Sequence, residues 1–323
     1  MNTAHLPVGM VLVGATVGFL GLRYYSRAKT SEFRPWGWLG FGMLILFEVL
    51  LVFRVGWVGI YFTPLCWTSY LLLADAAVCS LKGSSQLSES PRDFLLLALA
   101  SIPLWLIFEA YNLLMQNWTY VGLPANPVLR NLGYAWSFAT IWPAIFETAD
   151  LLKALDLFSR PIRPHAPFSR TCRTTLIVVG ALFLAAPLLV PAGIGQYLFA
   201  PVWVGFVLLL EPANYAWGGH SLLRDREKGD SSLFWNFMAA GLVCGVFWEF
   251  WNYWATARWL YIFPILQGWK IFEMPLPGFL GFPAFAVECF VMFESVKVLA
   301  RGLFQTRQGD QVSRSCTSAA ESK

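Results

Sequence analysis

Long apolar segments follow one another along most of the chain, and they constrain its fold more than any other feature. Nine of them are long enough to be helices that cross a bilayer, which takes about 20 apolar residues each. They lie at 6–26, 37–53, 57–79, 94–115, 133–152, 175–191, 195–217, 233–256 and 277–299. The sequence therefore predicts an all-α integral membrane protein with about nine transmembrane helices.

The composition excludes several other classes of protein. Charged residues make up 13% and hydrophobic residues 57% of the 323 residues, whereas an average soluble domain has about 25% charged residues. The net charge is only +4, and no stripe of Lys and Arg is interleaved with aromatic residues, so nucleic acid is not an expected partner. The six cysteines and three histidines are scattered without metal-ligand spacing. We therefore expect the lipid bilayer as a partner, and neither a metal nor another cofactor.

The distribution of basic residues predicts the orientation. Nineteen of the 23 Lys and Arg residues lie in alternate connectors or in the C-terminal region, and the other four are Arg54, Arg130, Arg258 and Lys270. Cytoplasmic loops carry the excess of Lys and Arg in membrane proteins. Nine spans place all nineteen on the cytoplasmic side when the N-terminus is outside, so we expect an outside N-terminus and a cytoplasmic C-terminus.

The chain contains an internal repeat. Four residues of the first half recur in the same order 140 or 141 residues later: Glu109, Asn112, Trp118 and Tyr120 match Glu249, Asn252, Trp259 and Tyr261. Three further residues recur at similar offsets: Trp67 and Asp75 match Trp203 and Glu211, and Glu147 matches Glu288. Because each unit has four spans, both copies enter the membrane in the same direction, as parallel repeats with a site expected where they meet.

The repeat divides the chain into five parts. We expect an N-terminal transmembrane helix with a basic loop at 1–35, a first four-helix repeat at 36–158, a basic cytoplasmic linker at 159–174, a second four-helix repeat at 175–304 and a disordered C-terminal tail at 305–323.

Acidic residues inside the predicted spans are the candidates for chemistry. A charge at bilayer depth costs about 2.5–3.5 kcal/mol on insertion scales, so such acids usually face the bundle interior and mark functional sites. Glu109 and Asn112, like Glu249 and Asn252, are three residues apart on one helix face, where the amide can orient the acid. Tryptophans cluster beside these acids, and indole rings can stabilise a cation in an apolar pocket. Protonation of an alkene requires this combination of an acid and an aromatic wall.

The order Glu, two residues, Asn, Trp-x-Tyr and then Pro followed by Glu resembles the lycopene cyclase domain, an integral membrane domain of bacterial and fungal carotenoid cyclases. The resemblance covers about 50 residues in each half. It implies an enzyme that acts without flavin on a hydrophobic isoprenoid or lipid substrate. We expect Glu147 or Glu288 to be the acid, and the pairs of Glu109 with Asn112 and of Glu249 with Asn252 to orient it or to act as base. The predicted substrate contacts are Trp118, Tyr120, Trp259, Tyr261, Trp142 and Trp248.

Two other functions stay open at this point. The chain could be a transporter or carrier whose acids bind protons or cations between the repeats, or a membrane scaffold without catalysis. An apolar groove would favour the cyclase, a water-filled path to both faces would favour transport, and scattered acids would favour the scaffold. The oligomeric state is also left open.

Overall fold

The computed structural model describes residues 5–320, without the side chains of residues 192 and 303–320. Within this part of the chain, eight helical segments are long and apolar enough to cross a membrane. They are α1 (Leu6–Ser26), α2 (Pro35–Val52), α3 (Gly56–Lys82), α5 (Pro91–Met115), α8 (Arg170–Leu189), α10 (Phe199–Ala216), α12 (Ser232–Trp254) and the segment Leu276–Gly302. The last comprises the 3-10 helix η1 (Leu276–Leu280) and the first part of α13 (Gly281–Ala320). The expected all-α membrane architecture is confirmed at this level, whereas the expected tail at 305–323 lies outside the residues whose side chains are described.

Shorter elements connect or complete these segments. The short helices are α4 (Gln86–Glu89), α6 (Pro127–Ala139), α7 (Ile141–Ala154), α9 (Ala192–Gly195) and α11 (Leu222–Glu227). The strands are β1 (Trp118–Val121), β2 (Arg258–Tyr261), β3 (Lys270–Ile271) and β4 (Met274–Pro275). They form two antiparallel pairs, β1 with β2 and β3 with β4.

Proline and glycine set several helix boundaries. The helices α2, α5 and α6 each begin at a proline, whose missing N–H is not needed in the first helical turn. Asn126 also caps α6, because its side chain accepts the N–H groups of Val128 and Leu129. At the other end of α3, Gly83 adopts the left-handed conformation with φ of 86°, which glycine takes without steric cost.

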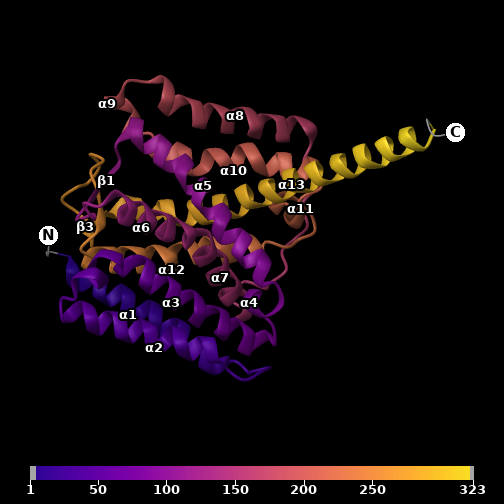
Figure 1. The fold of residues 1–323 in the computed structure, drawn as a ribbon. Helices are drawn as coiled ribbons and strands as arrows, with labels where there is room; N and C mark the ends of the chain where they lie inside the picture. The colour runs from indigo at the N-terminus through magenta and orange to yellow at the C-terminus, as the bar shows by residue number, and fades with distance from the viewer. Residues whose placement is uncertain (1–4, 321–323) are drawn as a thin grey trace.

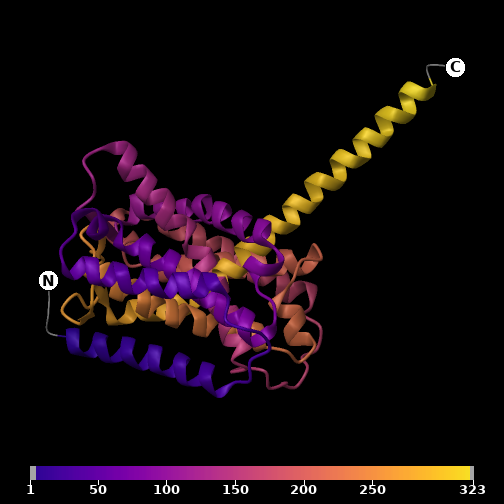
Figure 2. The same cartoon turned by 60° about the horizontal axis from the view of Figure 1, so that its bottom comes forward.

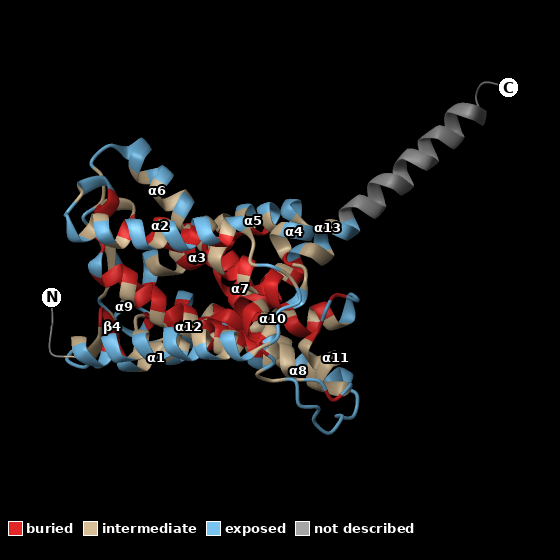
Figure 3. Cartoon of the chain, turned by 90° about the horizontal axis from the view of Figure 1, so that it is seen from below, coloured by how far each residue is buried: buried red, intermediate tan, exposed pale blue. Residues whose placement is uncertain are grey.

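The segment expected to be the fifth span, 133–152, is two helices in the structure. The first, α6, slants away from the bundle, whereas α7 is largely buried (Figure 2; Figure 3). Pro143 has no N–H to bond the carbonyl of Ala139, and its ring crowds that carbonyl, so a continuous helix is disfavoured here. The break falls at Thr140, between the two helices.

The connections lie at two opposite ends of the bundle. Figure 1 shows the N-terminus, β1, β3 and α9 at one end and α4 and α11 at the other, where α13 leaves the bundle. The chain ends therefore lie on opposite sides of the helical layer. Buried residues fill its centre around α3, α7, α10 and α12, while α1, α2 and α5 carry extensive exposed faces (Figure 3). This is the distribution expected of helices whose outer faces contact lipid.

Two helix pairs flank this centre, α2 against α3 and α8 against α10 (Figure 1). Each pair is held closely by a glycine. A Cβ atom at Gly40 would come within 2.5 Å of the carbonyl oxygen of Ser69, and one at Gly180 within 2.8 Å of that of Gly205. Gly40 and Gly180 are 140 residues apart, and the residues that they contact, Ser69 and Gly205, are 136 residues apart. Both offsets agree with the internal repeat, so the two halves pack their helix pairs in the same way.

Candidate functional site

The two strands β1 and β2 join the halves of the chain at matched positions. Trp118 is paired with Tyr261, and Tyr120 with Trp259. Because Trp118 corresponds to Trp259 and Tyr120 to Tyr261 in the repeat, each half pairs its tryptophan with the tyrosine of the other half. The pairing is therefore locally two-fold symmetric, and it brings four of the predicted substrate-binding residues onto one small ladder.

An asparagine at the end of the preceding helix holds each strand. The Nδ2 atom of Asn112 donates to the carbonyl of Trp118 at 2.9 Å, and its Oδ1 atom accepts the N–H of Trp118 at 3.1 Å. The Nδ2 atom of Asn252 donates to the carbonyl of Trp259 at 2.9 Å, and its Oδ1 atom accepts the N–H of Trp259 at 2.9 Å. Both predicted asparagines therefore fix the turn from helix to strand.

Three donors converge on Glu109. Its Oε1 atom accepts hydrogen bonds from the phenol of Tyr120 at 2.5 Å, the indole N–H of Trp105 at 2.9 Å and that of Trp118 at 3.2 Å. Multiple donors on one carboxylate oxygen are typical of an ionised acceptor, since such bonds are strengthened by the charge. Glu109 therefore anchors the polar edges of three aromatic side chains.

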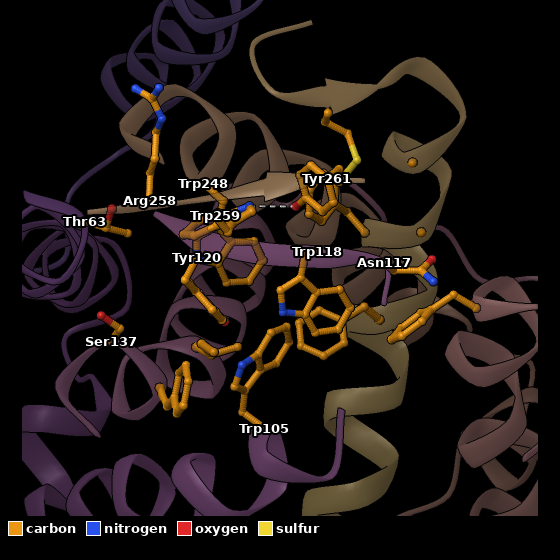
Figure 4. A pocket seen from close by; sticks show the side chains of 18 of the residues that line it. Thr63, Trp105, Asn117, Trp118, Tyr120, Ser137, Trp248, Arg258, Trp259 and Tyr261 are labelled. Carbon is orange, nitrogen blue, oxygen red and sulfur yellow. Dashed lines mark hydrogen bonds between the residues drawn. The ribbon is translucent and has the colours of Figure 1, made fainter. Parts of the chain in front are cut away.

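Glu249 occupies the corresponding position in the second half with fewer partners. Its Oε1 atom accepts a hydrogen bond from the phenol of Tyr261 at 2.9 Å, and Trp259 donates to that phenol rather than to the carboxyl group, also at 2.9 Å (Figure 4). Glu249 is fully buried, and its Oε2 atom has no hydrogen-bond partner within the described residues. The two matched acids therefore differ in environment.

The phenols of Tyr120 and Tyr261 are held in their neutral form. Burial raises the pKa of Tyr120 well above its usual value, and the neighbouring Glu109 adds to the effect. Burial likewise raises the pKa of Tyr261, with a further contribution from Glu249. Both phenols therefore carry their proton at neutral pH and can donate it in a hydrogen bond.

These aromatic residues line a cavity of about 500 Å³ between the two halves (Figure 4). We call it the aromatic cavity. Its wall is mostly apolar and combines β1 and β2 with the adjoining ends of α3, α6, α10 and α13. Among its many aromatic residues are Trp67, Trp105, Trp118, Tyr120, Trp203, Trp248, Trp259, Tyr261 and Phe285. A cavity of this size and character is typical of a site for an apolar small molecule.

The structure divides the predicted site residues into two layers. The cavity is lined by five predicted substrate contacts: Trp118, Tyr120, Trp259, Tyr261 and Trp248. Glu109, Asn112, Glu249 and Asn252 lie behind this wall and are joined to it by the hydrogen bonds described above. Trp142 lies elsewhere, because it is fully buried in α7 and donates its indole N–H to the carbonyl of Cys289 at 2.9 Å.

Glu147 and Glu288 are not part of the wall of the aromatic cavity. They sit on α7 and α13, exposed by 1% and 0%, and neither is among the residues that line the cavity. The carboxyl oxygens of both have no hydrogen-bond partner among the described residues. Their predicted role as the acid stays a prediction, with no contact to the aromatic cavity to support it.

Several cavity residues escaped the sequence-based prediction. Trp67 and Trp203 were matched by the repeat, but nothing in the sequence indicated that they face a common space. In the structure, the ring of Trp67 lies 5.1 Å from that of Trp248, and the ring of Trp203 lies 5.0 Å from that of Phe285. Trp105 precedes Glu109 by four residues, which places both side chains on one helix face. This spacing could have predicted their hydrogen bond.

Two other intramembrane acids have a structural role. Asp75 accepts the hydroxyl of Ser85 at 2.9 Å and the N–H of Leu87 at 3.0 Å, which fastens α4 to α3. Its match, Glu211, accepts the hydroxyl of Ser221 at 2.5 Å and the N–H of Leu223 at 3.0 Å, which fastens α11 to α10. These acids lie at the end of the bundle opposite the aromatic cavity.

The fold and the site together define a helical membrane protein with an aromatic cavity at one end of the bundle. In the described part of the chain, no group of three or more His, Cys, Asp or Glu side chains is arranged to hold a metal ion. Comparisons of the chain with protein-family models, curated proteins and solved structures find no match.

Proposed function

We propose that this chain is an integral-membrane cyclase that binds an isoprenoid in the aromatic cavity and closes a ring by acid catalysis. The observation that carries the proposal is the aromatic cavity itself, whose wall contains two neutral phenols, one backed by the half-buried Glu109 and the other by the buried Glu249. Aromatic faces stabilise a carbocation by about 0.5–2 kcal/mol per contact, so several rings around one cavity favour this reaction class.

The different partners of the two acids suggest their roles. Glu249 has one donor and a buried oxygen without a partner among the described residues, which suits a carboxylic acid that carries a proton. Glu109 accepts three hydrogen bonds on one oxygen, which suits a carboxylate. We therefore assign the acid to Glu249, acting through Tyr261, and the base to Glu109, acting through Tyr120.

The reaction can be written so that every proton is accounted for. In this step the hydrogen bond between Tyr261 and Glu249 reverses: the protonated carboxyl group of Glu249 turns to donate to the phenol oxygen. The phenol proton of Tyr261 then moves to a terminal alkene carbon, and the carboxyl proton of Glu249 replaces it on the phenol oxygen. The resulting cation is attacked by a second alkene of the same molecule, which forms the carbon–carbon bond of the ring. A carbon next to the new cation loses a proton through Tyr120 to Glu109. The product is an isomer of the substrate, and one proton returns from Glu109 to Glu249 before the next turnover.

The proposal includes the finer architecture of the chain. It comprises nine crossings with the N-terminus outside, an extra first helix, and two parallel four-helix repeats in which α6 and α7 together form the fifth crossing. Support comes from the ends of the chain on opposite sides of the bundle (Figure 1), from the matched Asn–strand hydrogen bonds and from the matched glycine contacts. On this assignment the aromatic cavity lies near the outer face.

The position of the cavity favours the cyclase over a transporter. All the lining residues come from the end of the bundle that carries β1 and β2. A transport path has to reach the opposite end, where Asp75 and Glu211 instead fasten short helices. The lining is also mostly apolar, which suits a hydrocarbon better than a hydrated ion.

The test is expression of the full chain in cells that accumulate linear isoprenoids, with analysis of the lipid extract by chromatography and mass spectrometry. We expect a new product with the mass of its precursor and fewer double bonds. Glu249→Gln and Tyr261→Phe should reduce it by at least about 100-fold, the usual contribution of general acid catalysis. The control variants Glu147→Gln and Glu288→Gln should retain it. Absence of a cyclic product with the native chain, or its persistence in Glu249→Gln, would sink the proposal.

A further inference from the structure

One wall of the aromatic cavity contains buried hydrogen-bond donors that no protein group satisfies. Thr63 and Trp67 both line the cavity, and they are exposed by 7% and 1%. The hydroxyl of Thr63 and the indole N–H of Trp67 have no hydrogen-bond partner within the described residues. The two are four residues apart on α3, so they lie on the same face of that helix.

The other indoles around the cavity differ in this respect. Trp105 and Trp118 donate to Glu109, and Trp259 donates to the phenol of Tyr261. A buried hydrogen-bond donor without a partner lowers the stability of the folded state, and native proteins rarely contain one. Two such donors on one helical face that lines a cavity therefore point to a ligand that supplies an acceptor.

The backbone of α3 is irregular at the same place. Pro64 lies inside α3 and has no N–H, so the carbonyl of Ile60 lacks its ordinary helical donor. The helix is also distorted next to it, with Tyr61 at φ of −102° and ψ of 17°. Ile60 lines the cavity together with Pro64, Thr63 and Trp67. The two unpartnered donors therefore lie on a distorted turn of α3 that lines the cavity.

We infer that the natural ligand is an isoprenoid alcohol whose hydroxyl group binds to this turn of α3. Its oxygen accepts the N–H of Trp67 and the hydroxyl of Thr63. A hydroxyl oxygen has two lone pairs, so one such oxygen can accept from both donors. The hydrocarbon part fills the aromatic remainder of the cavity. This inference rests on the proposed function, and it narrows the substrate from isoprenoids in general to those that carry a hydroxyl group.

The experiment compares two probes of the same chain length, farnesol and the hydrocarbon farnesene. Their binding to the purified full chain in detergent micelles is measured by native mass spectrometry. Each hydrogen bond that a buried donor gains contributes about 0.5–1.5 kcal/mol, so we expect farnesol to bind roughly tenfold more tightly than farnesene.

The variants Trp67→Phe and Thr63→Val remove one donor each. Thr63→Val keeps the shape of the side chain, and Trp67→Phe keeps an aromatic ring in the wall. Each should weaken farnesol binding by several-fold and leave farnesene binding unchanged. Thr63→Ser keeps the hydroxyl group and should retain the preference. Trp142→Phe is the matched control, because it removes a buried indole N–H outside the cavity.

The outcomes separate the two proposals. Equal binding of farnesol and farnesene by the native chain, or an unchanged preference in both Trp67→Phe and Thr63→Val, would overturn the inference and leave the isoprenoid site standing. Failure of both probes to bind would overturn the proposed function and the inference together.

Discussion

Removal of the Asn252 side chain tests how the strands that carry the cavity wall are held. In Asn252→Ala, the N–H and the carbonyl of Trp259 each lose a hydrogen bond of 2.9 Å. Asn252 is fully buried, so water cannot replace its amide in the folded state. Each lost bond costs about 1 kcal/mol, and more where the remaining group stays buried without a partner. The free energy of unfolding should therefore fall by about 2–4 kcal/mol.

The matched position supplies the control. Asn112 makes similar hydrogen bonds to Trp118 and accepts a third from the N–H of Asn117 at 2.8 Å. It is only half-buried, however, so water can replace much of all three bonds when its side chain is removed. Asn112→Ala should therefore cost less, about 1–2 kcal/mol. Both values are measured by unfolding the purified chain with increasing SDS in mixed micelles, followed by tryptophan emission and helical circular dichroism. A loss below about 0.5 kcal/mol for Asn252→Ala, or a larger loss at Asn112, would refute the reasoning.

Three further predictions concern packing, pH and topology. Gly40→Ala and Gly180→Ala should each lower the free energy of unfolding by about 1–3 kcal/mol, because the new Cβ meets backbone atoms of the neighbouring helix; an unchanged unfolding midpoint in SDS would contradict this. The hydrogen bond between His220 and the carboxylate of Asp225 raises the pKa of His220. The protonated His220 therefore stabilises the folded state below about pH 6.5, and this stabilisation is lost as the pH rises through the raised pKa. The melting temperature should therefore fall slightly between pH 5.5 and 8.5, and a His220→Gln variant with the same fall would exclude this cause. In intact cells, an impermeant maleimide should label Ala125→Cys but reach Ser84→Cys only after permeabilisation, and the reverse pattern would contradict the proposed orientation.

Much of the fold could be predicted because bilayer crossing imposes strong patterns on a sequence. Apolar length located the spans, and proline marked the first residue of α2 and α5. The exception was the segment 133–152, where hydropathy alone suggested one helix. Pro143 interrupts it, and whether a proline kinks or separates two helices depends on the packing around it, which a hydropathy pattern does not contain.

The internal repeat made part of the candidate site predictable from the sequence. Matched positions drew attention to Trp118, Tyr120 and their counterparts, and the structure brings all four together. The donors on α3 could not be found in this way, because their significance depends on the absence of a nearby protein acceptor. Glu147 illustrates the opposite case, since its place in an apolar span predicted burial but not its absence from the cavity wall, which depends on packing.

The central claim is that an isoprenoid occupies the aromatic cavity. Photoaffinity labelling with a diazirine-bearing analogue of farnesol, followed by peptide mass spectrometry, measures this directly. The account predicts labels in the segments that contribute to the cavity wall, mainly 60–67, 117–141, 196–204, 257–265 and 274–285, and their suppression by excess farnesol. Labelling concentrated on α7 around Glu147, or spread over the lipid-facing surfaces of α1 and α2 without competition, would contradict it.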